Sequence, residues 1–153
     1  MILPIVAYGH PVLRQLAEDI DADYPQLDKL IEDMWETMYA SSGVGLAAPQ
    51  IGRLRQVIVI QPSVDDPPEG LINPRITAMS EETELGPEGC LSIGEVLVEV
   101  ARSVRITVVA QNVAGEAREF TCEGFPARVI QHEVDHLNGV LILDRTSPEG
   151  TTF

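Results

Sequence analysis

Residues 126–138 of the chain read PARVIQHEVDHLN. At ~100° per residue on a helix, the apolar residues of this segment fall within a stripe ~80° wide, which comprises Ala127, Ile130, Val134 and Leu137. His132 and His136 lie only ~40° apart, on roughly the opposite side. The pattern predicts a helix from about Pro126 to Asn138 with one face packed in a core, and Gly139 is suited to cap its end.

The second face of this helix carries the pattern His-Glu-x-x-His, formed by His132, Glu133 and His136. The i, i+4 spacing lets both imidazoles reach one metal ion, with Glu133 beside the water that the ion holds. The alternative is a pair of ordinary surface or core histidines, because a five-residue pattern also arises by chance. A catalytic metal usually takes three protein ligands, so the motif predicts a third ligand elsewhere in the chain.

Cys90 is the best candidate for the third ligand. It lies within GPEGCLS, residues 86–92, where small and turn-forming neighbours let the backbone approach a centre closely. The alternative is an inert buried cysteine, which is our interpretation of Cys122. One thiolate with two imidazoles suits Zn(II) or Fe(II) and leaves a fourth position for water.

A glycine-rich loop, GVGLAAPQIG, occupies residues 43–52. It superficially matches a dinucleotide-binding fingerprint, but that fingerprint needs a strand before it and a helix after it. Here a predicted helix precedes the loop, and Pro49 and Gly52 follow its glycines. We therefore interpret the loop as exposed backbone that binds an extended peptide, with Gln50 as a buried amide donor.

The rest of the chain favours an α+β fold. A helix is predicted from about Pro25 to Ser41, with a core-facing stripe that comprises Leu27, Leu30, Ile31, Met34, Trp35 and Met38. Short strands are predicted at 57–60, 71–78, 95–100, 104–108, 117–121 and 140–143. Pro74 indicates an edge or a bulge in the second of these strands.

Length and charge limit the class of protein. The 153 residues predict a single domain, 1–153, in which 147–153 form a loose tail. The net charge of −14 disfavours direct binding to nucleic acid or to an anionic membrane surface. No apolar run approaches the ~18 residues that span a bilayer, and the first residues lack the basic region of a signal peptide. We expect an intracellular protein, although its two cysteines could form one disulfide.

Three segments, 43–50, 88–92 and 131–137, together resemble the motifs of the peptide deformylase family, in the family's order. The likeness extends from Tyr8 to Arg145. It implies an α+β fold in which small antiparallel or mixed sheets pack around the central His-Glu-x-x-His helix. It also implies a cytoplasmic hydrolase that removes the formyl group from N-formylmethionyl nascent peptides and releases formate.

The resemblance implies that Cys90, His132 and His136 bind Fe(II), which Zn(II), Ni(II) or Co(II) can replace. The metal would lower the pKa of its water and polarise the formyl oxygen. Glu133 would take the proton of the attacking water and pass it to the leaving amine.

The same resemblance implies roles for residues around the metal. The side-chain amide of Gln50 and the backbone N–H of Leu91 would stabilise the developing oxyanion. Glu88 would support the loop around the site. The residues expected to bind substrate or to lie against it are Gly43, Val44, Gly45, Glu88, Phe125 and Val129.

The sequence departs from the family in two places. Gly94 and Leu97 stand where many relatives have proline and arginine, which would weaken the grip on the substrate backbone. The chain also lacks the basic C-terminal helix of many relatives, so ribosome contact is expected to be transient at most. Two alternatives remain open at this point. One is a metallopeptidase, and the other is a weak or inactive relative that binds a metal and captures peptide N-termini.

Overall fold

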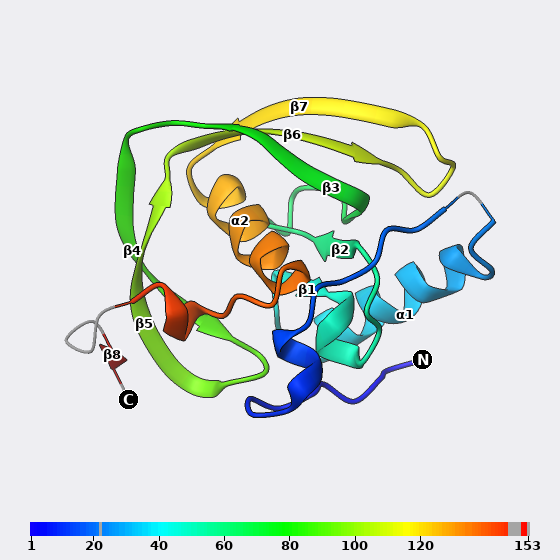
Figure 1. The fold of residues 1–153 in the computed structure, drawn as a ribbon, viewed down its shortest axis with the longest axis horizontal. Coiled ribbons are helices and arrows are strands. Elements are labelled where there is room, and N and C mark those ends of the chain that lie inside the picture. Colours follow the sequence, from blue (N-terminus) through cyan, green and yellow to red (C-terminus); the bar gives the residue numbers. More distant parts are fainter. Residues whose placement is uncertain (22, 147–150, 153) are drawn as a thin grey trace.

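The computed structural model describes residues 1–21, 23–146 and 151–152 of the chain. At its centre lies the helix α2 (Phe125–Leu137), and strands surround it on several sides (Figure 1). The helix α1 (Leu27–Ala40) lies at one end of the molecule, away from α2 (Figure 1). The α+β class is therefore confirmed, with α2 as the central helix. Among the described residues, no helix combines the length and the apolar character needed to cross a membrane.

The strands form two sheets in which all neighbouring strands are antiparallel. The larger sheet has the order β1-β2-β3-β6-β7 and consists of β1 (Gly45–Ala47), β2 (Val57–Ile60), β3 (Glu69–Met79), β6 (Arg105–Gln111) and β7 (Ala117–Glu123). The smaller sheet has the order β4-β5-β8 and consists of β4 (Thr83–Cys90), β5 (Gly94–Ser103) and β8 (Thr151–Thr152).

The apolar stripe predicted for α2 is confirmed. Ala127, Ile130 and Leu137 are buried in one core cluster with residues of β2, β3 and β6, and Val134 packs against this cluster. The opposite face of the helix is also covered, because His136 is only 2% exposed. A helix covered on both faces can hold polar side chains away from bulk water, which is what a reactive site needs.

The strand β2 separates two parts of the core. Its side chains alternate, so that Ile58 joins the cluster around α2 and Val59 joins the cluster that contains Met34 and Met38 of α1. Both faces of β2 are therefore buried, which explains why it reads as a continuous apolar run. The core places β1 and the loop after it against α2.

Several predicted elements differ from the structure. The strand expected at 140–143 is wrong, because Ile142–Asp144 form a 3₁₀ turn in which the Asp144 carboxylate accepts a hydrogen bond from the Leu141 N–H at 2.8 Å. A run of four apolar residues cannot by its pattern distinguish a strand from a buried turn. Of the predicted loose tail, residues 147–150 and 153 lie outside the described residues. The remaining two form β8 and pair with Leu97 and Val98, so the prediction is wrong for them.

Two segments interpreted as loops contain strands. The glycine-rich loop includes β1, which pairs with β2, and the segment around Cys90 includes the end of β4, which pairs with β5. Glycine and proline have low strand propensity, but partner strands supply the pairing that local sequence does not show. The bulge expected at Pro74 is confirmed by a register shift between Ile72 and Arg75.

Candidate functional site

The predicted metal ligands lie together. Cys90 ends β4, while His132 and His136 lie one turn apart on α2. One ligand atom from each residue lies within 4.8 Å of the other two, and Cys90 Sγ is 3.4 Å from His136 Nε2. Cys90 is 6% exposed, and the side chain of His132 is 11% exposed. Two imidazoles and one sulfur at this spacing can hold a single metal ion.

Glu133 independently indicates a reactive site beside the metal cluster. Its Oε1 is fully buried and has no hydrogen-bond partner among the described residues. Buried carboxylate oxygens normally have partners, so this atom fits a site that accepts a water or a substrate proton. Burial raises the pKa of Glu133 to about 7, which is suitable for a group that takes and returns a proton near neutral pH.

Gly45 leaves the space that Glu133 occupies. A Cβ atom at position 45 would lie 2.6 Å from Glu133 Oε2 and 3.0 Å from its Cγ. Since no real Cβ approaches so closely, any larger residue would displace the carboxylate. The glycine-rich loop therefore contributes to the site by its lack of a side chain.

Glu88 is held as an anion beside the metal ligands. Its Oε1 accepts hydrogen bonds from Arg102 Nη2 at 2.8 Å and His132 Nδ1 at 3.0 Å. Its Oε2 accepts from Arg102 Nε at 2.9 Å and Arg128 Nη1 at 2.6 Å. Burial opposes ionisation of Glu88, but the hydrogen bonds from Arg102 and His132 outweigh it and lower its pKa to about 2. The contact leaves Nε2 of His132 free to face Cys90.

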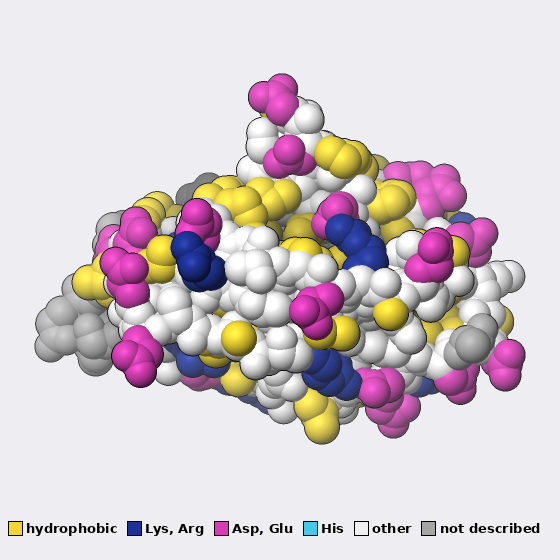
Figure 2. Space-filling view, turned by 90° about the horizontal axis from the view of Figure 1, so that it is seen from above, with side chains coloured by type: hydrophobic (Ala, Val, Ile, Leu, Met, Phe, Trp, Pro, Cys, Tyr) yellow, Lys and Arg dark blue, Asp and Glu magenta, His cyan; other side chains and the backbone are white. Residues whose placement is uncertain are grey.

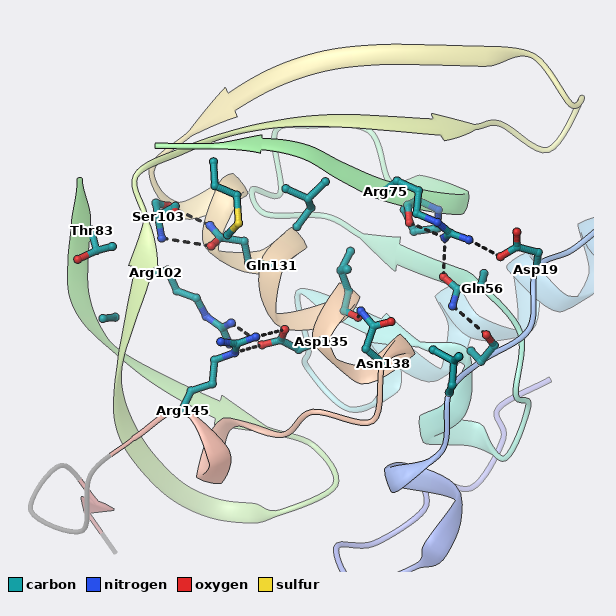
Figure 3. A pocket seen from close by; sticks show the side chains of 17 residues that line it. Asp19, Gln56, Arg75, Thr83, Arg102, Ser103, Gln131, Asp135, Asn138 and Arg145 are labelled. Carbon is teal, nitrogen blue, oxygen red and sulfur yellow. Dashed lines mark hydrogen bonds and ion pairs between the residues drawn. The ribbon is translucent and has the colours of Figure 1, made fainter. Parts of the chain in front are cut away.

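Three arginines that were not predicted from the sequence bind Glu88 or Asp135, namely Arg102, Arg128 and Arg145. Arg102 is buried and also donates from Nη1 to Asp135 Oδ2 at 2.6 Å (Figure 3). Arg145 binds the same Asp135 carboxylate from the outside, at 2.6 and 2.8 Å (Figure 3). A signal for Arg102 was present, because it continues the buried alternation of Val98 and Val100 along β5. A charged residue at a strand position that continues a row of buried apolar residues predicts a buried ion pair.

Gln50 lies at the edge of the metal cluster and is 2% exposed. Its Oε1 accepts from the Ala47 N–H at 3.0 Å, which fixes the orientation of the amide. Its Nε2 points to Ser92 Oγ at 3.2 Å and to Cys90 Sγ at 3.6 Å. The amide donor is thus aimed at the cluster, where a substrate oxygen could accept from it.

The cluster opens into a cavity of about 480 Å³. All residues expected to bind substrate line it, namely Gly43, Val44, Gly45, Glu88, Phe125 and Val129. Gln50, Leu91 and Gly94 line it too, whereas Leu97 does not. Leu97 is 49% exposed and lies just behind the wall, since a Cβ on Gly89 would be 3.3 Å from its Cδ2.

Two other features concern charge and thiols. Acidic side chains are spread over the face of the molecule seen in Figure 2, in line with the net charge of −14. Cys90 and Cys122 are both free, so the disulfide that the two could form is not present. Cys122 packs at the edge of the core around α2, outside the metal cluster.

Comparisons with known proteins agree over the length of the chain. A sequence model of the family described as polypeptide deformylase matches residues 2–152. The peptide deformylase of Thermotoga neapolitana is 51% identical over 141 residues, which cover 92% of this chain and 85% of that protein. The peptide deformylase of Dictyoglomus turgidum is 44% identical, with 99% of this chain and 97% of that protein covered.

Solved structures have the same fold. The crystal structure of peptide deformylase from Thermotoga maritima has a TM-score of 0.92 and 49% identity, covering 97% of this chain and 99% of that one. A Met-Ala-Ser-bound structure of class I type b peptide deformylase from Acinetobacter baumannii has a TM-score of 0.89 and 36% identity. That match covers 95% of this chain and 98% of the other.

Proposed function

This chain belongs to the polypeptide deformylase family, and from that premise we propose how its residues carry out the reaction. The protein is a metal-dependent hydrolase that removes the formyl group from the N-formylmethionine of newly made polypeptides and releases formate. The observation that carries the proposal is the Cys-His-His cluster beside a buried Glu133 oxygen that has no partner among the described residues, with Cys90, His132 and Glu133 lining one cavity.

We propose that Cys90, His132 and His136 bind one Fe(II) ion, which Zn(II), Ni(II) or Co(II) can replace. A thiolate with two imidazoles suits these metals and leaves one coordination position open. When bound, the metal lowers the pKa of a water and polarises the formyl oxygen. Metal analysis of protein purified without oxygen tests the choice of iron.

Glu133 acts as the general base and then as the general acid. Its unpartnered oxygen takes a proton from the attacking water, and the same carboxyl group gives that proton to the leaving amine. A pKa raised by burial to about 7 supports both halves of this transfer. Gly45 leaves room for the carboxylate because it has no side chain.

Gln50 and Leu91 stabilise negative charge on the formyl oxygen. The Gln50 amide is oriented in advance by its bond to Ala47, so it needs no reorganisation during the reaction. The Leu91 backbone N–H follows directly after Cys90, and Leu91 lines the same cavity. The two donors therefore supply the oxyanion site.

The cavity binds the first residue of the substrate. Val44, Phe125 and Val129 give it an apolar wall suited to a methionine side chain. Gly43 and Gly45 line this cavity, and Gly45 begins β1, the edge strand of the larger sheet, whose open side can pair with an extended peptide. The Acinetobacter baumannii relative bound to Met-Ala-Ser supports this assignment, because its fold matches over nearly the whole chain.

We place the protein in the cytoplasm, as one catalytic domain over residues 1–153, where nascent peptides are its partners. Its charge of −14 opposes a lasting contact with ribosomal RNA or with an anionic membrane surface, so contact with the ribosome is transient.

Formate release from formyl-Met-Ala-Ser tests the function. Protein loaded with Fe(II) in the absence of oxygen should release one formate for each amine exposed, and Glu133→Gln should lose this activity. A loaded protein that binds the peptide but releases no formate would instead be the inactive relative that captures N-termini.

A further inference from the structure

Arg128 belongs to two neighbouring cavities. It lines the substrate cavity and also a second cavity of about 330 Å³ on its other side. The two cavities share Pro87, Phe125 and Arg128 in their walls. Among the described residues that line the substrate cavity, Arg128 is the only arginine or lysine. A fixed cation thus lies in the wall of the substrate cavity, next to apolar residues such as Phe125 and Val129.

The guanidinium of Arg128 is held firmly, and its side chain is only 15% exposed. Nη1 donates to Glu88 Oε2 at 2.6 Å and to the Val100 carbonyl at 3.0 Å. Nη2 donates to the Glu84 carbonyl at 2.7 Å. Contacts on both nitrogens fix the plane of the group, so its remaining donors have defined directions.

Two of the five N–H donors of Arg128 remain available. Three are used by the contacts to Glu88, Val100 and Glu84. Nε has no partner among the described residues, and it is not one of the fully buried unpaired atoms, so it is not fully enclosed by protein. The backbone of Gly86, which lines the second cavity, packs closely against the guanidinium, because a Cβ there would lie 3.0 Å from Cζ of Arg128.

Arg128 lies close to the metal cluster along α2. Arg128 precedes His132 by four residues, which is about 6 Å along the axis of α2. The Glu88 carboxylate contacts both Arg128 and His132 and so spans the gap between them. A first residue whose formyl group lies at the metal cluster can therefore direct the tip of its side chain toward Arg128.

We propose that Arg128 is a specificity-determining residue that donates a hydrogen bond to an acceptor at the tip of the first side chain. The enzyme would then deformylate chains that begin with methionine sulfoxide as well as those that begin with methionine. This inference rests on the deformylase function proposed above. Water adds to the formyl carbon, the C–N bond breaks, formate leaves, and the sulfoxide itself is unchanged.

The physical reason is the cost of burying the sulfoxide. Oxidation turns the apolar tip of methionine into a polar group. An apolar pocket without a donor would leave the sulfoxide oxygen unpaired, which is unfavourable. Arg128 can supply the missing partner, while the thioether of ordinary methionine needs none. The same pocket would then accept both forms of the residue.

The test compares three peptides that differ only in the first side chain. They are formyl-Met-Ala-Ser, its methionine sulfoxide form and its norleucine form, which is an apolar mimic of methionine. For the wild-type protein we expect kcat/KM for the sulfoxide within about tenfold of that for norleucine, whereas an apolar pocket alone would discriminate by about 10². In Arg128→Met the sulfoxide-to-norleucine ratio should fall by about tenfold or more.

The ratio separates specificity from support of Glu88. If Arg128→Met lowers kcat/KM only because the contact to Glu88 is broken, all three peptides are affected equally. The sulfoxide-to-norleucine ratio then stays the same. Arg145→Met is the matched control, because it removes another carboxylate-bound arginine that does not line the substrate cavity, and its ratio should equal that of the wild type. An unchanged ratio in Arg128→Met, or a wild-type protein that rejects the sulfoxide, would overturn the proposal. Failure on formyl-Met-Ala-Ser itself would refute the proposed deformylase function instead.

Discussion

The helix α2 separates two cavities that differ in how their polar groups are paired. The metal cluster and the substrate cavity of about 480 Å³ lie on the side of His132 and Glu133. A larger cavity, of about 660 Å³, lies on the side of Gln131 and Asp135 (Figure 3). Volume alone would select the wrong side of the helix.

The two sides of α2 differ in whether their buried polar side chains have hydrogen-bond or ion-pair partners. In the larger cavity Asp135 is bound by two arginines, and Gln131 bonds to the backbone of Ser103 on both of its amide atoms (Figure 3). None of the fully buried side-chain atoms without a partner, among the described residues, belongs to its lining. Two of those atoms lie on the other side, in Glu133 and His136. Polar groups that satisfy one another stabilise the fold, whereas unpaired ones are available for chemistry.

The largest expected effect comes from removing a metal ligand. Cys90→Ala should lose the metal and fall to background activity, because two imidazoles do not form a complete catalytic site. Metal content per chain and formate release measure this. Cys122→Ala is the control and should keep both, since Cys122 lies outside the cluster. Equal loss of metal in the two variants would indicate a structural site that uses both cysteines.

The next largest effect is expected on the side of α2 that faces the substrate cavity. Glu133→Gln should keep its metal but lose at least ~10²-fold in kcat, because the proton transfer is removed and the ligands remain. Near-normal kcat in Glu133→Gln would show that another group is the base.

Gln50→Ala should lose ~10²-fold or more in kcat by removing an oxyanion donor, with little change in metal content.

The paired side of α2 should respond in stability and not in rate. Gln131→Leu removes the bonds to the N–H and carbonyl of Ser103, both at buried positions. We expect a loss of about 1–3 kcal/mol in the free energy of unfolding, with little change in the kcat of the folded enzyme. Denaturant titration and steady-state kinetics measure the two quantities. A large fall in kcat without loss of stability would contradict the division between the two sides.

The smallest effect is expected just outside the substrate cavity, at Leu97. Leucine cannot donate a hydrogen bond to the backbone of a bound peptide, so KM should change little between formyl-Met dipeptides and longer peptides. Leu97→Arg should lower KM for the longer peptides by about tenfold or less, through a charge-assisted hydrogen bond at an exposed position, with kcat little changed. Unchanged KM at every peptide length would show that substrate does not reach this residue.

Local periodicity was sufficient to predict much of the fold. The stripes on α1 and α2 were predictable because helix packing repeats at a period that the sequence itself displays. The strands β1 and β4 were missed because glycine- and proline-containing segments become strands only through a partner strand. The segment 140–143 was assigned to a strand because four apolar residues carry no distinguishable period.

The sequence by itself determined which residues could do the chemistry. The spacing of His132 and His136 places both on one face of a helix through geometry that is local to a single turn. Tertiary structure alone decided which partners each group has. Cys90 reaches the pair across 46 positions, while Arg102 and Arg128 come from different elements to bind Glu88. Only packing pairs Asp135 and leaves one Glu133 oxygen without a partner among the described residues, because pairing depends on neighbours that are distant along the chain.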